Sequence, residues 1–149
     1  MTGAFRFALA MASIITVAAG AAIGASQAGR MDQMSQTNDF KPYTAEAVKA
    51  AMGEGKTTLL FFHAPWCPVC KAQEPKVKAQ LGGAHKDVVA FKVDFDSNVA
   101  LRKELKVDKQ STLILYQGMQ EVARLSYKSD DESIAQFFSH ATMAKSGAR

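Results

Sequence analysis

The residues best suited to chemistry in this sequence are Cys67 and Cys70, the only cysteines among its 149 residues. They lie three positions apart, directly after the apolar run TTLLFFHA and directly before a segment of helical composition. A pair with this spacing can act as a redox centre, supply half of a tetrahedral metal site, or form a structural disulfide. The elements around the pair help to distinguish these three possibilities.

The cysteines are predicted to lie at a junction between a strand and a helix. A continuous apolar run such as that over residues 57–64 is typical of a central strand covered on both faces. Residues 70–81 are helical in composition, with a kink expected at Pro75. Free amides and the helix dipole at the helix N-terminus stabilise a thiolate, so Cys67 is the predicted nucleophile. Cys70, one turn later and expected to be more buried, is the predicted resolving thiol.

The other two interpretations of the pair are weaker but stay open. A disulfide that closes so short a loop restrains little of the unfolded chain. A zinc site needs two further ligands, and His63 is the one histidine nearby in the sequence. A soft metal, with Cu(I) as the expected ion, is therefore kept as the alternative to redox chemistry.

The composition predicts one globular domain behind an N-terminal leader. The chain is 48% hydrophobic and 21% charged, which is ordinary for a folded domain. Residues 1–28 contain a single charge, Arg6, and end in small residues, so we expect a signal peptide cleaved after Ala28. An uncleaved membrane anchor is the alternative, because an apolar stretch of roughly 17 residues is at the lower edge of what spans a bilayer. Either outcome predicts an extracytoplasmic location, expected to be the periplasm.

The remaining residues divide into a short tether and a domain. Residues 29–39 are polar and lack periodicity, so a flexible tether is expected there, and the domain is assigned to residues 40–145. The net charge of +4 is spread among acidic residues, which argues against a nucleic-acid partner. GEGK at residues 53–56 lacks the spacing of a phosphate-binding loop.

The element order predicted along the domain is helix, strand, helix, strand, helix, hairpin, helix. Thr44 is the expected cap of the first helix and Asn98 of the third. A turn around Gly118 joins two apolar runs into the hairpin. Ser129 or Asp130 is expected to cap the last helix, whose predicted inward face is formed by Ile134, Phe137, Phe138 and Ala141. This order is α/β, with a mixed central sheet and helices on both sides.

The segment FFHAPWCPVCKAQEP, residues 61–75, resembles the active-site segment of the thioredoxin superfamily. The resemblance depends on Trp66 before the first cysteine, Lys71 after the second, and Pro75, and it extends over residues 40–145. It implies a thioredoxin-like fold with a central mixed four- or five-stranded sheet flanked by helices. It also implies thiol–disulfide exchange that starts at the first cysteine and needs no organic cofactor.

Two residues depart from the pattern of that family. Phe61 stands where cytoplasmic thioredoxins have a buried aspartate, so Lys92, which matches the accompanying lysine, has no partner there. Ser111 stands where the family has a cis-proline, in a loop that the resemblance places opposite the cysteines. Its hydroxyl could reach a cysteine thiolate, or it could be a tolerated loop residue. The configuration of the peptide bond before Ser111 stays open.

Five residues are expected to contact substrate or tune the cysteine pair. Trp66 is the expected surface platform, and the dipeptide Pro68-Val69 hints at a more oxidising potential. The resemblance adds Ser111 and Thr112. His63 is expected to be satisfied within the fold or exposed to solvent, with a place beside the cysteines as the alternative.

Together these observations predict extracytoplasmic thiol–disulfide exchange on protein substrates. The lack of any sizeable inserted segment favours a dedicated reductant, for example of the cytochrome c maturation type. A disulfide-forming oxidase and a copper or soft-metal binding protein are the alternatives. The expected partners are protein thiols or disulfides and a membrane or soluble redox protein that resets the pair, and the chain is expected to be a monomer.

Overall fold

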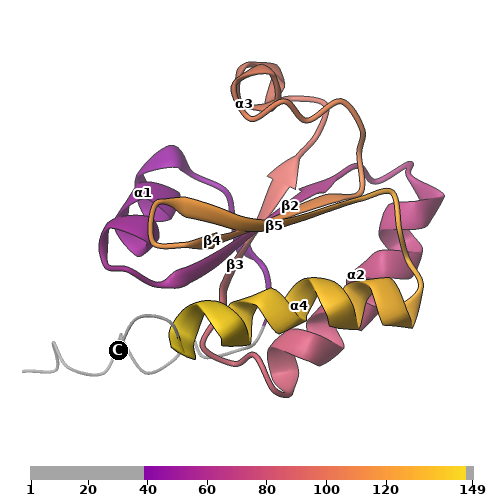
Figure 1. The fold of residues 1–149 in the computed structure, drawn as a ribbon. Helices are drawn as coiled ribbons and strands as arrows, with labels where there is room; N and C mark the ends of the chain where they lie inside the picture. The colour runs from indigo at the N-terminus through magenta and orange to yellow at the C-terminus, as the bar shows by residue number, and fades with distance from the viewer. Residues whose placement is uncertain (1–38, 147–149) are drawn as a thin grey trace, which may run out of the picture. The chain divides into compact units, whose positions relative to one another are not determined.

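The computed structural model describes residues 39–146 (Figure 1). The predicted leader and all of the predicted tether except Asp39 therefore lie outside the described residues. The elements in chain order are β1 (Lys41–Pro42), α1 (Ala45–Gly53), β2 (Thr57–His63), α2 (Pro68–Gly82), β3 (Val89–Asp94), α3 (Val99–Glu104), β4 (Thr112–Gln117), β5 (Gln120–Ser126) and α4 (Asp131–Ser146).

The strands form one mixed five-stranded sheet in the order β1-β3-β2-β4-β5. β2 pairs in parallel with β3 and antiparallel with β4, and the β4–β5 hairpin completes one edge. This architecture confirms the predicted α/β class and the thioredoxin-like sheet. β1 was not predicted, because two residues with exposed side chains leave no recognisable pattern.

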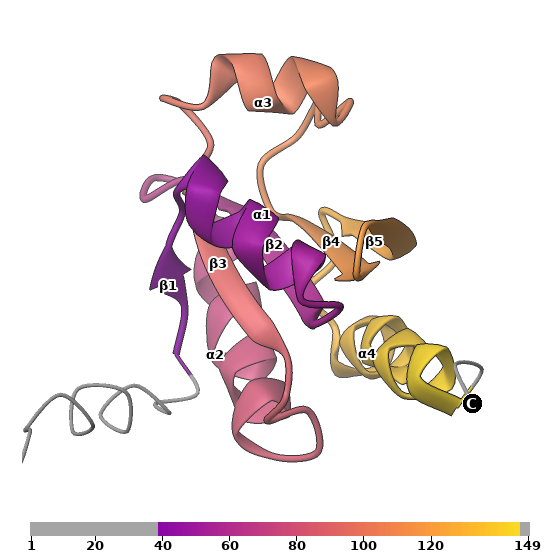
Figure 2. The same ribbon diagram turned by 90° about the vertical axis from the view of Figure 1, so that its left-hand side faces the viewer.

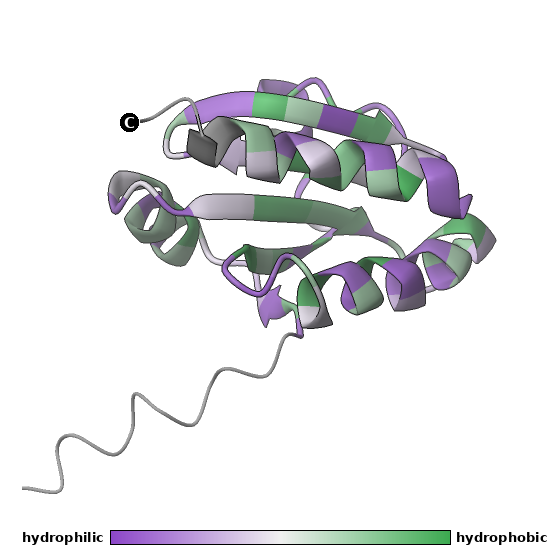
Figure 3. Ribbon diagram, turned by 60° about the horizontal axis from the view of Figure 1, so that its bottom comes forward, coloured by the Kyte–Doolittle hydropathy of each residue, from purple (hydrophilic) through white to green (hydrophobic). Residues whose placement is uncertain are grey.

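Helices cover both sides of this sheet. α2 and α4 lie together on one side, and α3 lies on the other (Figures 1 and 2). Hydrophobic and hydrophilic residues alternate around the flanking helices, as expected for elements with one face on a core (Figure 3). α4 buries the four residues predicted to face inward, Ile134, Phe137, Phe138 and Ala141.

β2 is the centre of the core and ends at the cysteine segment. Six of its seven residues are buried, which fits the continuous apolar run in the sequence. Burying a large apolar side chain stabilises a fold by about 1.5–3 kcal/mol, so β2 is a rigid support. The chain leaves it at His63 and enters α2 at Pro68.

The helix ends test the predicted caps. The Thr44 hydroxyl accepts a hydrogen bond from the Ala47 amide at 3.1 Å, as expected. Asp130, rather than Ser129, caps α4, because its carboxylate accepts from the Ser133 amide at 2.8 Å. Asn98 occupies the N-cap position of α3, as predicted, but its side chain makes no capping hydrogen bond and instead donates to the Asp94 carbonyl at 2.8 Å.

Two further features concern the helices and the hairpin. α2 continues through Pro75 to Gly82. The hairpin turns at Gly118, whose φ of 57° is in the left-handed region that glycine adopts without a steric penalty. Of the helices in residues 39–146, none combines the length and the apolar character needed to cross a membrane.

Candidate functional site

Cys67 occupies the N-cap position of α2, directly after the segment that leaves β2. Its backbone is extended, its amide donates to the Ala64 carbonyl at 3.1 Å, and its sulfur accepts from the Cys70 amide at 3.1 Å. Pro68 follows at the first helical position, where a missing N–H removes no helical hydrogen bond. Cys67 thus takes the place of the oxygen-bearing side chain that usually caps a helix.

Both cysteines are free thiols in this structure, and both have a relative exposure of 0%. The expectation that Cys70 is the more buried of the two is therefore wrong. The reason is local: the Cys67 sulfur is turned over the first turn of α2 to accept the Cys70 amide, rather than toward solvent.

The environment of Cys70 favours its protonated form. Burial raises the pKa of Cys70 to about 11, and its hydrogen bond with Cys67 adds to the rise. The Ala64 backbone and the Ser111 side chain act to lower the pKa, but they do not offset burial. Cys70 is therefore a thiol at neutral pH.

Ser111 lies against the cysteines with a strained backbone. No peptide bond within residues 39–146 is cis, so the bond before Ser111 is trans. Its φ of 61° is in the left-handed region, which costs a serine on the order of 1–3 kcal/mol. Two backbone hydrogen bonds hold it there: its amide donates to the Phe62 carbonyl at 2.8 Å, and its carbonyl accepts from the Tyr127 amide at 2.9 Å. Ser111 itself is fully buried.

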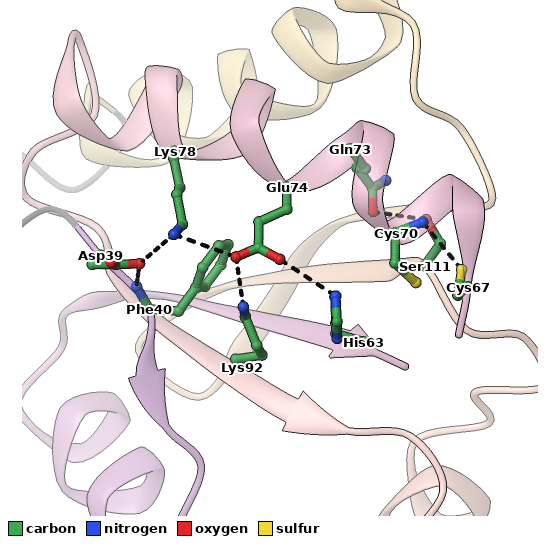
Figure 4. Close-up of polar contacts among 10 residues, drawn as sticks. All are labelled: Asp39, Phe40, His63, Cys67, Cys70, Gln73, Glu74, Lys78, Lys92 and Ser111. Atoms are coloured by element: carbon green, nitrogen blue, oxygen red, sulfur yellow. Dashed lines mark hydrogen bonds and ion pairs between the residues drawn. The ribbon is translucent and has the colours of Figure 1, made fainter. Parts of the chain in front are cut away.

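Gln73 is a site residue that sequence reasoning missed. It is polar yet has a relative exposure of 0%. Its side-chain oxygen accepts from the Ser111 hydroxyl at 2.8 Å, and its side-chain nitrogen donates to the Lys128 carbonyl at 2.6 Å. We call this arrangement of Gln73, Ser111 and the Lys128 carbonyl the Gln73 bridge, and Figure 4 shows its two side chains beside the cysteines. Helical spacing from Cys70 was the available signal, since Cys70, Gln73, Val77 and Leu81 are the buried residues of α2.

The remaining predicted site residues have different exposures. Trp66 is 57% exposed, and its indole N–H donates to the Asp96 carboxylate at 2.8 Å, which orients the ring. Val69 is half-buried against the core. The Thr112 hydroxyl donates to the Lys109 carbonyl at 2.8 Å and lies 3.0 Å from the Ser126 hydroxyl, so it is engaged within the protein.

Lys92 has an acidic partner that does not come from the neighbouring strand. Phe61 is fully buried at the position expected for an aspartate, but Glu74 reaches Lys92 from α2, with 2.6 Å between carboxylate oxygen and Nζ. The same carboxylate lies 3.3 Å from the Lys78 ammonium and 3.3 Å from His63 Nε2. Lys92 therefore has an acidic partner in the folded protein, although the partner expected at position 61 is absent.

Lys78 also pairs with Asp39 at 3.0 Å, which extends the ionic group to the first described residue. We call this group the Glu74 cluster; it consists of Asp39, His63, Glu74, Lys78 and Lys92 (Figure 4). His63 is thus satisfied within the fold, which is one of the placements expected from the sequence.

The cluster shifts two pKa values downward. Burial acts to raise the pKa of Glu74, but the hydrogen bonds and charges of Lys92 and Lys78 overcome it and lower that pKa. Burial and the Lys92 charge lower the pKa of His63 more than the Glu74 carboxylate raises it. The ionised carboxylate and the neutral imidazole are therefore the favoured forms.

Across the described part of the chain, residues 39–146, no group of three or more histidine, cysteine, aspartate or glutamate residues is placed to hold a metal ion.

A cysteine pair at the start of the helix that follows the central strand of a mixed sheet defines a dithiol redox module. The thioredoxin family model matches residues 39–140, and the chain belongs to this family. It is therefore a thioredoxin-type thiol–disulfide oxidoreductase with a Cys67–Cys70 pair, and thioredoxins act on protein thiols and disulfides.

Similar proteins are consistent with this assignment. Thioredoxin H3 of Arabidopsis thaliana is 35% identical over 98 residues, which cover 66% of this chain and 82% of that protein. The solved structure of Trxlp from Edwardsiella tarda is 37% identical, with a TM-score of 0.62, and the match covers 64% of this chain and 94% of that one. Mitochondrial thioredoxin 3 of Saccharomyces cerevisiae, at 20% identity and a TM-score of 0.58 over 65% of this chain and 91% of that one, shares the fold.

Proposed function

We propose that this protein performs thiol–disulfide exchange on protein substrates in the periplasm, as a dedicated reductant. Delivery of electrons to cysteines during cytochrome c maturation is an example of such a role. The apolar leader in residues 1–28 supports the location. The environment of Cys70 supports the direction of electron flow.

A cysteine pair is a strong oxidant when its reduced form is specially stabilised, for example by thiolates at acidic pKa values. Burial raises the pKa of Cys70 to about 11, so at neutral pH the reduced form gains nothing from a Cys70 thiolate. This supports the reducing direction, as does the lack of any sizeable inserted segment among the elements of residues 39–146.

The proposed reaction has two steps. The Cys67 thiolate attacks one sulfur of a substrate disulfide, and the other substrate sulfur leaves as a thiol after taking up a proton. The Cys70 sulfur then attacks Cys67, and the bound substrate sulfur departs with the proton that Cys70 loses. Two electrons have passed to the substrate, and Cys67 and Cys70 form a disulfide.

The cycle closes when a partner supplies two electrons. A membrane or soluble dithiol protein reduces the Cys67–Cys70 disulfide and becomes a disulfide itself. Both cysteines have 0% exposure, so we expect substrates and this partner to approach beside the exposed Trp66 and to induce a small opening at Cys67. The protein acts as a monomer in this scheme.

A trapping experiment tests the function directly. Cys70→Ala removes the resolving thiol, so mixed disulfides between Cys67 and substrates should accumulate in the periplasm and be identifiable after purification. Cys67→Ala is the matched control and should trap far fewer partners. An empty trap under conditions in which the wild type is active would contradict the mechanism, and recovery of the protein in the cytoplasm would contradict the location.

Equilibration with glutathione buffers separates the proposed direction from the alternatives. A reductant should remain oxidised in buffers that fully reduce a disulfide-forming oxidase. Complete reduction in mildly reducing buffer would instead support the oxidase interpretation, which the Pro68-Val69 dipeptide hinted at. Tight binding of Cu(I) without any disulfide reduction would support the metal-binding alternative.

A further inference from the structure

The Gln73 bridge is a buried chain of hydrogen bonds that begins at Ser111, beside Cys70 (Figure 4). The Ser111 hydroxyl donates to the Gln73 side-chain oxygen at 2.8 Å, and both residues are fully buried. The Gln73 side-chain nitrogen continues the chain to the Lys128 carbonyl at 2.6 Å. Three segments thus meet here: α2, the loop before β4, and the loop before α4.

The chemistry of its end groups gives the bridge a direction. The Lys128 carbonyl can only accept, so it requires the NH₂ group of Gln73 and turns the amide oxygen toward Ser111. A hydroxyl has one proton to donate. In the reduced protein that proton is used on Gln73, so the Ser111 hydroxyl has no proton left to donate to Cys70.

The second step of exchange requires Cys70 to lose its proton. When Cys70 gives up its proton to attack Cys67, negative charge develops on a sulfur with 0% exposure. The polar groups that act on the pKa of this sulfur are the Cys67 side chain, the Ala64 backbone and the Ser111 side chain. Of these, the Ser111 hydroxyl can bring a proton to the sulfur by rotation about one bond.

The backbone of Ser111 is held in place, so the hydroxyl can rotate while the rest of the residue stays fixed. Hydrogen bonds to Phe62 and from Tyr127 hold it on two sides, at 2.8 Å and 2.9 Å, in the left-handed conformation. Only the hydroxyl hydrogen has to move, so the change requires no rearrangement of heavy atoms.

We propose that Gln73 is a positioning residue that holds the Ser111 hydroxyl away from Cys70 at rest and competes with the Cys70 thiolate for its proton. The hydroxyl donates to Gln73 while Cys70 is a thiol and turns to Cys70 as the mixed disulfide is resolved. Gln73 therefore restrains the resolving step, and Ser111 assists it. This inference rests on the order of attack in the proposed function, with Cys67 first and Cys70 second.

The test is a rapid-mixing reaction of the reduced protein with the aromatic disulfide 5,5′-dithiobis(2-nitrobenzoate). The first coloured thiol is released when Cys67 attacks, and the second when Cys70 resolves the mixed disulfide, so the two steps are observed separately. The rate of the second release is measured against pH for the wild type and three variants.

Gln73→Met removes the competing acceptor at similar side-chain length. We expect its second release to be faster by roughly fivefold, which corresponds to the contribution of one neutral hydrogen bond. The pH midpoint of this release should shift downward. Ser111→Ala should be slower by a similar factor, with its midpoint shifted upward. The double variant should match Ser111→Ala alone, because Gln73 acts only through the hydroxyl.

A purely structural role for Gln73 predicts different rates and pH midpoints. It would slow the second release in Gln73→Met without moving the pH midpoint, and the losses in the double variant would add; either result overturns the proposal. Thermal unfolding of each variant verifies that it is folded. If Gln73→Met does not fold, Ser111→Ala decides alone, since an unchanged second release would also overturn the proposal.

The order of attack is tested separately with the same reagent. Cys70→Ala should keep the first release and lose the second, while Cys67→Ala should lose the rapid first release. Reversal of these two results would contradict the proposed function itself, whatever the behaviour of the Gln73 variants.

Discussion

Gln73 and Glu74 are consecutive residues of α2, yet their side chains belong to two different polar groups, one neutral and one ionic. The Gln73 bridge is neutral, and both of its side chains are fully buried. The Glu74 cluster is ionic, and its members keep side-chain exposures of between 15% and 57%. Buried neutral hydrogen bonds are costly to break and insensitive to salt, whereas partly exposed ion pairs are weaker and screened. Two neighbouring positions of one helix thus provide a buried neutral contact beside the cysteines and a partly exposed ionic contact with the sheet.

The largest difference should appear when Gln73 is replaced. Gln73→Met removes two hydrogen bonds from a fully buried side chain, so we expect the free energy of unfolding to fall by about 2 kcal/mol. Denaturant titration measures it. Gln136→Met, on an exposed position of α4, is the matched control and should change stability by less than about 0.5 kcal/mol. Equal losses in the two variants would remove the distinction between buried and exposed amides.

Replacement of Glu74 should have a smaller effect that depends on salt. Glu74→Gln leaves Lys92, Lys78 and His63 without their carboxylate, and we expect a loss of about 1 kcal/mol at low ionic strength. At about 1 M salt, where screening acts within a few ångströms, the loss should shrink. The loss in Gln73→Met should stay constant over the same range. A Glu74 effect that does not depend on salt would break the comparison.

The pH dependence of the Glu74 cluster should be smaller again. Burial lowers the pKa of His63 below its ordinary value of 6.5, with Lys92 and Lys71 acting in the same direction and Glu74 and Asp94 opposing them. The folded state thus favours neutral His63, whose contribution is fully present above about pH 6.5 and is lost as the pH falls through the lower folded value. Wild type should therefore lose up to about 1 kcal/mol more stability than His63→Gln between about pH 7 and pH 5.

Melting temperatures at several pH values test this difference, with His140→Gln on the exposed face of α4 as the control. Identical pH profiles for wild type and His63→Gln would show that the imidazole gains or loses no proton on unfolding in this range.

The smallest effect is expected at an ion pair that has the same length but lies on the surface. Lys56 and Glu54 are 2.6 Å apart, as are Lys92 and Glu74. The side chains of Lys56 and Glu54, however, are 52% and 57% exposed. Glu54→Gln should change stability by less than about 0.5 kcal/mol. A loss as large as that of Glu74→Gln would mean that distance, rather than burial, decides the strength of these pairs.

The parts of the fold that were predictable are those with a strong local pattern. The apolar run of β2, the turn at Gly118 and the inward face of α4 each depend on neighbours in the sequence, and the structure has them as expected. The cysteine pair belongs to the same group, because its position follows from the strand before it and the helix after it. β1 was missed, since its two residues pair with β3 only after the sheet assembles. The position of Asn98 was predicted, but not the contact of its side chain with the Asp94 carbonyl, because a capping residue type does not specify which backbone group it binds.

The polar contacts of the site were harder to predict, for a physical reason. Glu74 meets Lys92 across 18 residues of sequence, and Gln73 meets Ser111 across 38, so neither pair has a local signature. A glutamine on a helix rich in lysine also looks like a solvent-facing residue unless its spacing from Cys70 is considered. The left-handed backbone of Ser111 was equally hidden, because serine carries no preference for it.

Trp66 gives the protein a built-in optical probe. It is the only tryptophan in the chain, it is adjacent to Cys67 in sequence, and it is held by Asp96 with more than half of its surface open to solvent. All indole fluorescence therefore originates at the redox centre. Each oxidation, reduction or docking event at Cys67 should be readable from the unlabelled protein, in real time and without a reporter substrate.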